Sequence, residues 1–496
     1  MPGIADRWRA LGSPRARRVL LLVLFLAFVV RVGWVAYAGV QPHFTSDPSA
    51  YLLQGETLAR GEGYVNPLVD IANAEHRARH EPLEPASPAS FYPPGYPAFV
   101  GAVVWVVWHT PIPDHAVIRT VGVLQAVLGT ISVLLTYLIA RTAFGTRVGL
   151  LAAALVAFYP NLVATTATLQ LETVFVFLTL LTVFVLLPVA TGVHPSRARL
   201  VAGGLLTGAV ALVRPTIGLV IVALLVTLLI ARVPAATLLR SVGVVVALMI
   251  VALVPWTVRN EVRLHAFVPV STGIGPTLCV SRNSEATGKL DTGIMYRKCQ
   301  PHRHFASPAA LDVATSNYGI RRAVDWVIHH PFSELHMWGT RTRLAFRDDT
   351  SGLGDVREHM THFWTDVATF VSNAASFVVL AGAAIGAIVV LRRRSRAALF
   401  VLLTAVALST QPVILYGDPR YRVPAEPFFA MLAAAGFAWA ATRIASFRYS
   451  NTDRRKAPML AKTSAAAGKP KLTNPCGWPG LHRASTATPS PRIRSA

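Results

Sequence analysis

Long apolar segments dominate this chain and limit its possible folds more than any other property. The first covers residues 19–40 and is interrupted only by Arg31. At 1.5 Å per residue it reaches about 33 Å, enough to cross a hydrocarbon core of roughly 30 Å. Comparable runs follow at 116–140, 147–163, 169–190, 199–213, 215–231, 238–258, 366–391, 397–415 and 424–445. The sequence therefore predicts an all-α polytopic membrane protein with about ten transmembrane helices.

Composition excludes an ordinary soluble enzyme. Only 14% of the residues are charged and 53% are hydrophobic, whereas soluble domains carry about 25% charged residues. The net charge of +23 would suggest nucleic acid in a soluble chain, but in an apolar chain it favours basic cytoplasmic flanks. The sequence contains no spacing of zinc ligands, and it contains no basic helix that is free of long apolar runs. We therefore expect no nucleic-acid partner.

The arginine clusters between the apolar runs predict the orientation. If the shorter run at 98–109 crossed the membrane, these clusters would face outward, against the positive-inside rule. Treated as an interfacial helix, this run leaves every cluster and both termini on the cytoplasmic side. The clusters are Arg141 with Arg147, Arg197 with Arg199, Arg232 with Arg240, and residues 392–396. We therefore expect a multi-pass plasma-membrane protein with extracytoplasmic loops.

This orientation divides the chain into five regions. We expect a basic cytoplasmic N-terminus at 1–18 and an N-terminal transmembrane module at 19–258, which includes the first outer loop at 41–115. An extracytoplasmic segment at 259–365 and transmembrane helices at 366–445 follow. Residues 446–496 carry ten Lys or Arg against one acid, which predicts a disordered basic cytoplasmic tail beside anionic lipid.

Two acidic residues at outer span ends are candidates for chemistry. Asp47 follows the first span and is suitably placed for a general base, although Asp followed by Pro also suits the start of a helix running to Arg60. Glu172 lies within an apolar segment, where an ionisable group by default suggests function. The alternative for Glu172 is a shallow, solvated position at the interface. Both residues are expected on the outer face and could line one cavity.

Three outer span ends also carry arginine. Arg214, Arg259, and Arg420 together with Arg422 fall where a guanidinium can bind two phosphate oxygens in a bidentate fork. Snorkelling of the long side chain toward water explains any one of them equally well. Three such sites on a face that should lack positive charge favour a phosphate ligand.

The first outer loop contains a rigid aromatic turn at residues 91–97, Phe-Tyr-Pro-Pro-Gly-Tyr-Pro. Its rings suit anchoring at headgroup depth, with sugar stacking on a tyrosine as the alternative. Cys279 and Cys299 both lie in the outer segment, where a disulfide is possible and not required. The loop histidines, His76, His80, His302 and His304, have no convergent acidic or cysteine partners, so no metal site is assigned.

These features in order resemble the GT-C glycosyltransferases, specifically the protein-mannosyltransferase and lipid A sugar-transferase branch. The matching features are Asp47 with Tyr51, Gly61 to Tyr64, Pro93 to Pro97, Glu172, Arg214-Pro215, Pro255 to Asn260, Ser271 to Gly288, and Asp418 to Pro424. The resemblance covers the chain from the first span to about Ala445. It implies a GT-C-like helical bundle, Asp47 as catalytic carboxylate and a polyprenyl-phosphate sugar donor.

This sequence departs from the pattern of the GT-C glycosyltransferases at one position. Many relatives place a second acid directly after the catalytic Asp, whereas Pro48 stands here. A divalent metal is therefore possible in such a site but not supported by this sequence, and no cofactor is assigned.

The sequence therefore predicts an inverting transfer of a sugar to an extracytoplasmic hydroxyl of a glycan, lipid or protein. Asp47 would act as base, Glu172 would orient the acceptor or an arginine, and Tyr51 and Tyr96 would contact acceptor or sugar. Arg420, Arg259 and Arg214 would bind the donor phosphate. A polytopic lipid or solute transporter, or a catalytically silent membrane scaffold, are the alternatives. A transporter usually shows inverted repeats, and none is detectable here.

Overall fold

A computed structural model of the protein describes residues 12–38, 47–66, 69, 76, 79–80, 87–192, 196–354, 356–357, 360–393 and 395–466, with side chains as far as residue 446. These residues are helical and contain no named strand, only an isolated antiparallel bridge between Val65 and Pro88. The chain forms two compact units, Met1–Ala440 and Ala441–Ala496. The all-α membrane architecture predicted from the apolar runs is confirmed.

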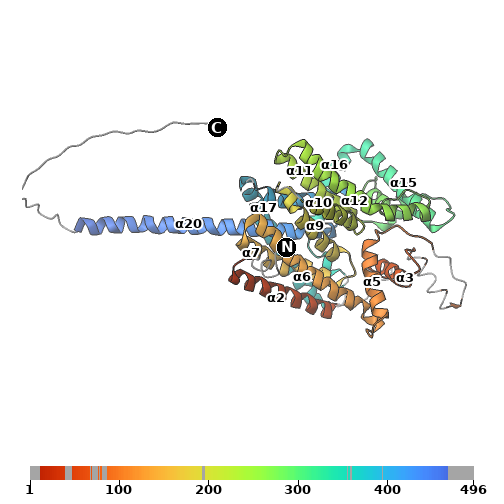
Figure 1. Ribbon diagram of the computed structural model, residues 1–496, viewed down its shortest axis with the longest axis horizontal. Helices are drawn as coiled ribbons and strands as arrows, with labels where there is room; N and C mark the ends of the chain where they lie inside the picture. Colours follow the sequence, from red (N-terminus) through yellow and green to blue (C-terminus); the bar gives the residue numbers. More distant parts are fainter. Residues whose placement is uncertain are drawn as a thin grey trace, which may run out of the picture. The chain divides into compact units, whose positions relative to one another are not determined.

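The helices of the first half (Figure 1) differ widely in length, from 5 to 30 residues. They are α2 (Pro14–Ala38), α3 (Asp47–Ala59), α5 (Gly95–Trp108), α6 (Val117–Phe144), α7 (Thr146–Ala157), α8 (Pro160–Ala164), α9 (Glu172–Ala190), α10 (Arg197–Ala211), α11 (Gly218–Ile230) and α12 (Ala235–Leu264). Short 3₁₀ turns lie between several of them, including η1 (Asp114–Ala116), η2 (Thr165–Ala167) and η3 (Pro215–Ile217).

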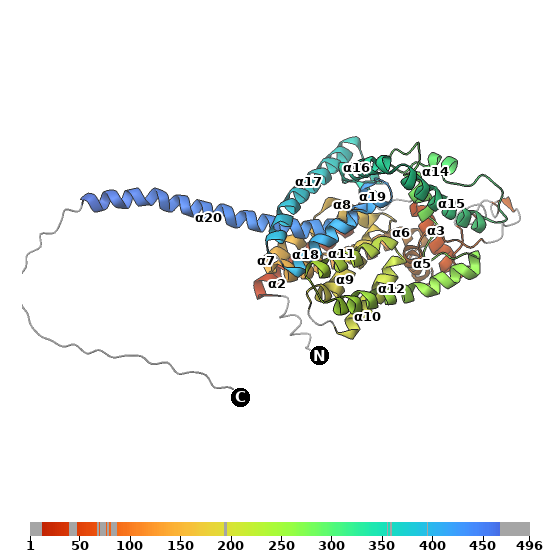
Figure 2. The same ribbon diagram turned by 90° about the horizontal axis from the view of Figure 1, so that it is seen from above.

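The second half begins with four helices of the outer segment and returns to the membrane. The helices are α13 (Ile274–Val280), α14 (Thr292–Lys298), α15 (Pro308–His329), α16 (Pro331–Arg347), α17 (His362–Arg393), α18 (Arg396–Leu408), α19 (Gln411–Ile414) and α20 (Glu426–Ala466). The turns η4 (Ser351–Leu353), η6 (Pro419–Tyr421) and η7 (Val423–Ala425) connect them. In Figure 2, α19 lies against α16, which brings the chain just before α20 beside the outer segment.

Seven described helical segments are long and apolar enough to cross a membrane, and the pair formed by α7 and α8 with η2, bent by 57°, gives an eighth. The predicted span at 199–213 corresponds to α10, and the predicted span at 215–231 corresponds to Pro215–Ile230. Both helices have fewer than 18 residues, because the chain breaks at Arg214 between them. The predicted number of about ten is therefore approximate. The predicted interfacial run at 98–109 is α5, which is also too short to count as a span.

Close packing of the spans depends on small residues. α2, α6 and α7 lie side by side (Figure 1), and α10 packs along α12. A Cβ added at Gly208 of α10 would lie 2.6 Å from the Met249 carbonyl oxygen of α12, so only glycine permits this approach. Such close backbone contact is the usual way in which helices associate in lipid.

Arg31, which interrupts the first apolar run, is 1% exposed within α2. Its guanidinium donates to the carbonyl oxygens of Val156 at 3.0 Å and Ala157 at 2.8 Å, in the last turn of α7. It therefore satisfies carbonyls that the end of an α-helix leaves without an intrahelical partner. The arginine joins the first span to the helix pair that follows α6.

The outer segment is helical and carries a disulfide. Cys279, in the last turn of α13, is bonded to Cys299, which follows α14, with a Cα–Cα distance of 5.7 Å. The disulfide left open by the sequence is therefore present. At the other end of the chain, α20 continues to Ala466, so the first part of the tail that we expected to be disordered is helical. The remaining residues of the tail, 467–496, lie outside the described residues.

Candidate active site

Asp47 is the first residue of α3, and its carboxylate binds two other segments of the chain. Arg420, in η6, donates from Nη1 to Asp47 Oδ2 at 2.8 Å. The Tyr92 hydroxyl, from the aromatic turn before α5, donates to Asp47 Oδ1 at 2.7 Å. Asp47 does begin a helix, as one interpretation of the sequence held, but both carboxylate oxygens serve this cluster.

Glu172 begins α9 and is fully buried, with 0% of its side chain exposed. Its Oε1 accepts a hydrogen bond from Arg214 Nη2 at 2.7 Å and another from Arg420 Nε at 3.1 Å. The shallow, solvated position considered for Glu172 is therefore wrong. Arg420 lies between the two acidic residues and bonds to both of them.

The cluster consists of two carboxylates and two guanidiniums, so its formal charges cancel, but its members differ in exposure. Asp47 keeps 35% of its side chain exposed, while Arg420 keeps 17% and Arg214 only 8%. Arg214 Nη1 and Glu172 Oε2 are buried and have no hydrogen-bond partner in the described part of the chain. The cluster therefore presents one accessible carboxylate, with an unused donor and an unused acceptor behind it.

The surroundings of Asp47 keep it ionised. Burial raises the pKa of this carboxyl, but the charge and hydrogen bond of Arg420, the hydrogen bond from Tyr92 and the charge of Arg214 lower it more, so the net pKa is below its usual value. A carboxylate that must accept a proton is therefore in the correct protonation state over the whole neutral range.

Three tyrosines form one wall of the site. The ring of Tyr51 packs edge-on against Tyr92 and against Tyr96, with centroids 5.0 Å apart in both pairs. Tyr96 donates to Gln125 Oε1 at 3.2 Å and is fully buried, and Tyr51 is only 2% exposed. Burial raises the pKa of each of these phenols, so they remain protonated. Tyr51 and Tyr96, predicted to contact acceptor or sugar, are both buried in this structure, and that role stays a prediction.

Arg259 has a different set of partners. It donates to the backbone carbonyls of Ala89 at 2.7 Å and Tyr64 at 2.6 Å, and its guanidinium lies 4.9 Å from the centroid of the Trp256 ring. In the described part of the chain it shares no hydrogen bond or ion pair with the Asp47 cluster. Arg259 holds the first outer loop against the end of α12, and its predicted role in phosphate binding stays a prediction.

The loop that carries Arg420 is fixed from two sides. Asp418 accepts a hydrogen bond from the Arg420 backbone N–H at 2.9 Å and so begins the turn η6. The Gly417 N–H donates to the Gly288 carbonyl oxygen in the outer segment at 2.7 Å. The position of the Arg420 side chain thus depends on the outer segment as well as on the spans.

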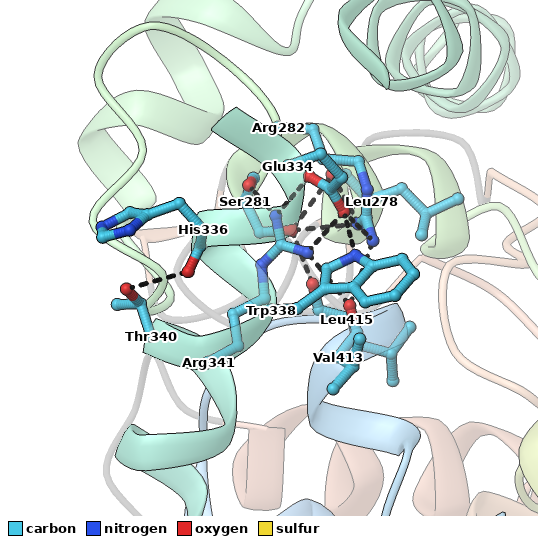
Figure 3. Close-up of polar contacts among 10 residues, drawn as sticks. All are labelled: Leu278, Ser281, Arg282, Glu334, His336, Trp338, Thr340, Arg341, Val413 and Leu415. Carbon is cyan, nitrogen blue, oxygen red and sulfur yellow. Dashed lines mark hydrogen bonds and ion pairs between the residues drawn. The ribbon is translucent and has the colours of Figure 1, made fainter. Parts of the chain in front are cut away.

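A buried ion cluster completes this attachment (Figure 3). Arg341 of α16 forms a bidentate pair with Glu334, at 2.7 and 2.9 Å, and also donates to the carbonyl oxygens of Val413 and Ser281. Arg282 lies 3.1 Å from the same carboxylate and donates to Val413 at 3.1 Å. Val413 lies in α19, seven residues before Arg420 along the chain. We call Glu334, Arg341 and Arg282 the α16 clamp.

A second buried network was not identified from the sequence. Arg422 pairs with Asp349 at 2.5 Å, and the Asn161 amide donates to Asp349 at 2.9 Å and to Glu426 at 3.0 Å. These residues come from α8, the end of the outer segment, the 3₁₀ turns and α20. Of these residues the sequence singled out only Arg422, beside Arg420 as a candidate phosphate ligand, whereas adjacent acids such as those at 348 and 349 are common on exposed loops. The network connects α8 to α20, which begins shortly after Arg420 in the chain.

The donor set at Asp47 does not fit a metal ion. Both carboxylate oxygens take hydrogen bonds from protein donors, and no group of three or more His, Cys, Asp or Glu side chains lies together among the described residues. Pro48, where many relatives have an acid, adds no ligand. We derive no step through a metal.

Part of the chain is similar in sequence to a known family, and its fold is similar to that of solved membrane enzymes. Residues 103–257 match the profile of the family described as dolichyl-phosphate-mannose-protein mannosyltransferase. The archaeal oligosaccharyltransferase AglB from Archaeoglobus fulgidus, solved with an inhibitory peptide and a dolichol-phosphate, is 14% identical and superimposes with a TM-score of 0.51, covering 93% of this chain and 53% of its own. The chain has the GT-C fold. The GT-C resemblance predicted from the sequence is thereby confirmed.

Other solved structures are also similar to this GT-C chain. The A. fulgidus oligosaccharyltransferase in complex with zinc and sulfate is 16% identical, with a TM-score of 0.50 and coverage of 90% of this chain and 51% of that one. ArnT from Cupriavidus metallidurans in the apo state is 16% identical with a TM-score of 0.49, covering 89% and 64%. No curated protein matches the chain. The chain spans about half the length of the oligosaccharyltransferases that it matches.

Proposed function

We propose that this protein is an integral-membrane glycosyltransferase that moves a sugar from a polyprenyl-phosphate donor to a hydroxyl of an extracytoplasmic acceptor. The observation that carries the proposal is the ion cluster at Asp47. A partly exposed, ionised carboxylate is held there by an arginine that a buried glutamate also binds. The solved AglB complex, which contains a dolichol-phosphate, supports a polyprenyl phosphate as the carrier.

In the proposed reaction, Asp47 accepts the proton of the acceptor hydroxyl while that oxygen attacks the anomeric carbon of the sugar. The bond between the anomeric carbon and the phosphate oxygen breaks, and the polyprenyl phosphate leaves with the bonding electron pair. The new bond forms on the opposite face of the sugar, so the configuration inverts. Help from a positioned base of this kind is worth about 10²- to 10⁴-fold.

The arginines have separate tasks in this proposal. The departing phosphate gains negative charge, and a fixed guanidinium beside it lowers the barrier in a site from which water is partly excluded. Arg420 is the candidate because it is the arginine that touches Asp47, and Arg214 adds a buried donor, Nη1, that has no protein partner among the described residues. Glu172 holds both guanidiniums in place and does not touch the substrate.

We also propose that the cluster faces the outside of the plasma membrane. The disulfide between Cys279 and Cys299 supports this assignment, because disulfides persist in oxidising compartments and are rare in the cytosol. The outer segment that carries the disulfide also forms the α16 clamp, which contacts the chain just before Arg420. This contact supports placing the Asp47 cluster on the same side of the membrane as the disulfide.

A direct test replaces Asp47 with asparagine. Membranes containing the D47N variant are supplied with polyprenyl-phosphate mannose or arabinose labelled in the sugar, and loss of label from the lipid is followed. We expect the rate to fall by at least about 100-fold. Retained label transfer in D47N would refute the assignment of Asp47.

The matched control for this variant is Asp418→Asn. Asp418 lies on the same loop as Arg420 and keeps an oxygen acceptor for the Arg420 N–H after the change. This variant removes a negative charge near the site without touching the proposed base, so it should keep most of the activity. A transporter would move the labelled lipid across the bilayer without detaching its sugar, which this assay distinguishes.

A further inference from the structure

A basic cleft lies apart from the Asp47 cluster, beside the C-terminal end of α12. It has a volume of about 960 Å³ and is bounded by residues 263–265, residues 301–307 and the N-terminal half of α15. Four of its lining residues are basic: Arg263, His265, Arg303 and Arg321. Among the residues that the structure describes, no Asp or Glu lines it. A concave surface lined by one sign of charge concentrates ligands of the opposite sign.

The arginines of this cleft have no acidic partners in the described part of the chain. Arg263, Arg303 and Arg321 are all exposed and form no ion pair with another described residue, and the Arg303 guanidinium lies 5.0 Å from the centroid of the Phe305 ring. Two other basic residues of the outer segment, Arg297 and Lys298, are instead neutralised by Glu285 at 3.1 and 2.9 Å. The positive charge of the cleft is therefore available to a ligand.

The length of α12 fits a position of the cleft in the headgroup region of a bilayer. α12 has 30 residues, and at 1.5 Å per residue it is about 45 Å long, the thickness of a bilayer with its headgroup regions included. Arg263 is the second-last residue of this helix, so the span itself carries it to the outer edge of the headgroup layer. A ligand can reach this level from the lipid or from water.

The remaining lining residues suit an amphiphilic ligand. Ala310, Val313 and Ala314 line the cleft from successive turns of α15 and form an apolar wall, while Asn317 and Tyr318 add hydrogen-bonding groups. Ser307, another lining residue, caps the start of α15 by accepting from the Ala310 N–H at 3.2 Å. The positive end of this helix dipole therefore adds to the arginine charges.

From these observations we propose that the cleft is a binding site for a phosphate ester, with the phosphate held by Arg263, Arg303 and Arg321 and its organic part against α15. Arginine suits this task because its fork of N–H donors matches the phosphate oxygens. The phosphate can belong to a phospholipid headgroup or to a water-borne phosphorylated molecule. Binding in the cleft does not depend on the proposed transfer reaction.

A chain of contacts connects the cleft to the Asp47 cluster. Arg259 lies one helical turn before Arg263 and donates to the carbonyl oxygens of Ala89, next to the lining residue Pro88, and of Tyr64. The Tyr64 hydroxyl donates to the Tyr92 carbonyl oxygen at 3.0 Å, and Tyr92 bonds to Asp47. If the proposed function holds, a phosphate-bearing acceptor in the cleft is therefore held beside the loop that positions the base.

The test measures binding by the full chain, with no catalytic readout. In one arm, purified protein in detergent is titrated with glycerol 1-phosphate in a calorimeter. In the other arm, protein from nanodiscs that contain phosphatidylglycerol in phosphatidylcholine is analysed by native mass spectrometry for retained phosphatidylglycerol. The variant R263Q/R303Q/R321Q is compared with R322Q/R343Q/R347Q, which removes the same charge from exposed positions of α15 and α16 outside the cleft.

We expect the cleft variant to bind at least about tenfold more weakly than the control variant, because charge-assisted hydrogen bonds to the phosphate are lost. A loss confined to phosphatidylglycerol supports the proposal and identifies a lipid source, and a loss confined to glycerol 1-phosphate supports it and identifies a water-borne source. Equal binding by the two variants in both arms would overturn the proposal. The single variants R321Q and R322Q, neighbours on one helix, repeat the comparison with minimal change to the fold.

Discussion

Arg420 donates a hydrogen bond to Asp47 at 2.8 Å from a position 373 residues later in the chain. The same guanidinium binds Glu172, so one side chain of the last third of the chain joins residues of the first and middle thirds. The geometry makes Asp47 the exposed member of the cluster and Glu172 the buried one. The two carboxylates therefore have different tasks, and substitutions at each should fail in different ways.

Glu172→Gln should lower the free energy of unfolding, because Glu172 is buried with two arginines. The change leaves Arg214 and Arg420 buried with only Asp47 to balance them, and breaking a buried pair costs about 3–5 kcal/mol. A thermal melt in detergent should show a clearly lower midpoint than the native chain. The double variant E172Q/R214M, which also removes one of the uncompensated charges, should recover part of the loss. A native-like midpoint for E172Q would contradict the structural role of Glu172.

Tyr92→Phe should change the pH dependence of transfer. The Tyr92 hydroxyl lowers the pKa of Asp47, so its loss raises that pKa toward the ordinary value of about 3.9. Because the base must be unprotonated, the rate of the native protein should fall only at a pH below this value, and that of Y92F should begin to fall at a higher pH. Initial rates of label transfer measured across acidic pH test this.

Tyr96→Phe provides the comparison for this experiment. Its hydroxyl donates to Gln125 and not to Asp47, so the acidic limb of the rate profile should stay in place. An acidic limb that moves equally in both variants would show that Tyr92 does not act through Asp47.

Glu334→Gln should reduce turnover through the position of Arg420. Glu334 holds Arg341 and Arg282, which donate to the Val413 carbonyl oxygen just before the Arg420 loop. A displacement of about 1 Å at a reacting group can cost 10²-fold in rate. We expect kcat to fall by about 10- to 100-fold with little change in KM for the donor, measured from label transfer at varied donor concentration.

Two further variants of α16 decide whether the clamp acts by position. Arg341→Lys keeps the charge but loses the bidentate fork, so it should be nearly as impaired as E334Q. Thr340→Val removes only a hydroxyl that donates to the His336 carbonyl oxygen within the same helix (Figure 3), and it should behave like the native protein. Full activity of both E334Q and R341K would exclude a positioning role.

Asp312→Asn should stabilise the protein at neutral pH. Burial within α15 raises the pKa of Asp312 to about 6. Between the unfolded value of about 3.9 and pH 6 the folded state binds more protons than the unfolded state, so stability falls as pH rises through this window and then levels off. The asparagine variant should lack this fall and gain up to about 3 kcal/mol at pH 7.

Thermal melts of the two proteins at pH 4 and pH 7 measure this effect. The difference between D312N and the native chain should be small at pH 4, where Asp312 is largely protonated in the folded state. A gain that is equal at both values would point to packing and not to ionisation.

The sequence predicted the membrane architecture and most of the charged cluster for one physical reason. Ionisable residues are costly in apolar segments, so Asp47, Glu172, Arg214 and Arg420 stood out at the ends of long runs. Arginines of this kind are alike in sequence, however, and Arg259 proved to bind backbone carbonyls. Its partners, Ala89 and Tyr64, lie 170 and 195 residues away and are set by how the first outer loop folds back.

The buried polar residues that the sequence did not identify lie in regions where their residue types are common. Asp349 and Glu334 occur in the polar outer segment, where acids are ordinary, and only the tertiary structure shows that both are buried. Asn161 binds partners 188 and 265 residues away, a pairing that no local pattern encodes. Tyr92 was assigned to an anchoring turn because its neighbours are prolines, and its hydroxyl contact with Asp47 depends on the packing of α3 against α5.

The arginine in the first span has a consequence for biogenesis. Arg31 reaches the bilayer on α2 before the ribosome has made Val156 and Ala157, whose carbonyls receive it in the finished protein. Before then its guanidinium can donate to the Ala27 carbonyl oxygen of its own helix, at 3.2 Å in the finished protein, and an arginine near a helix centre disfavours translocon insertion by about 2.5–3.5 kcal/mol. The protein environment of Arg31 is therefore complete only after α7 has been made and packs against α2.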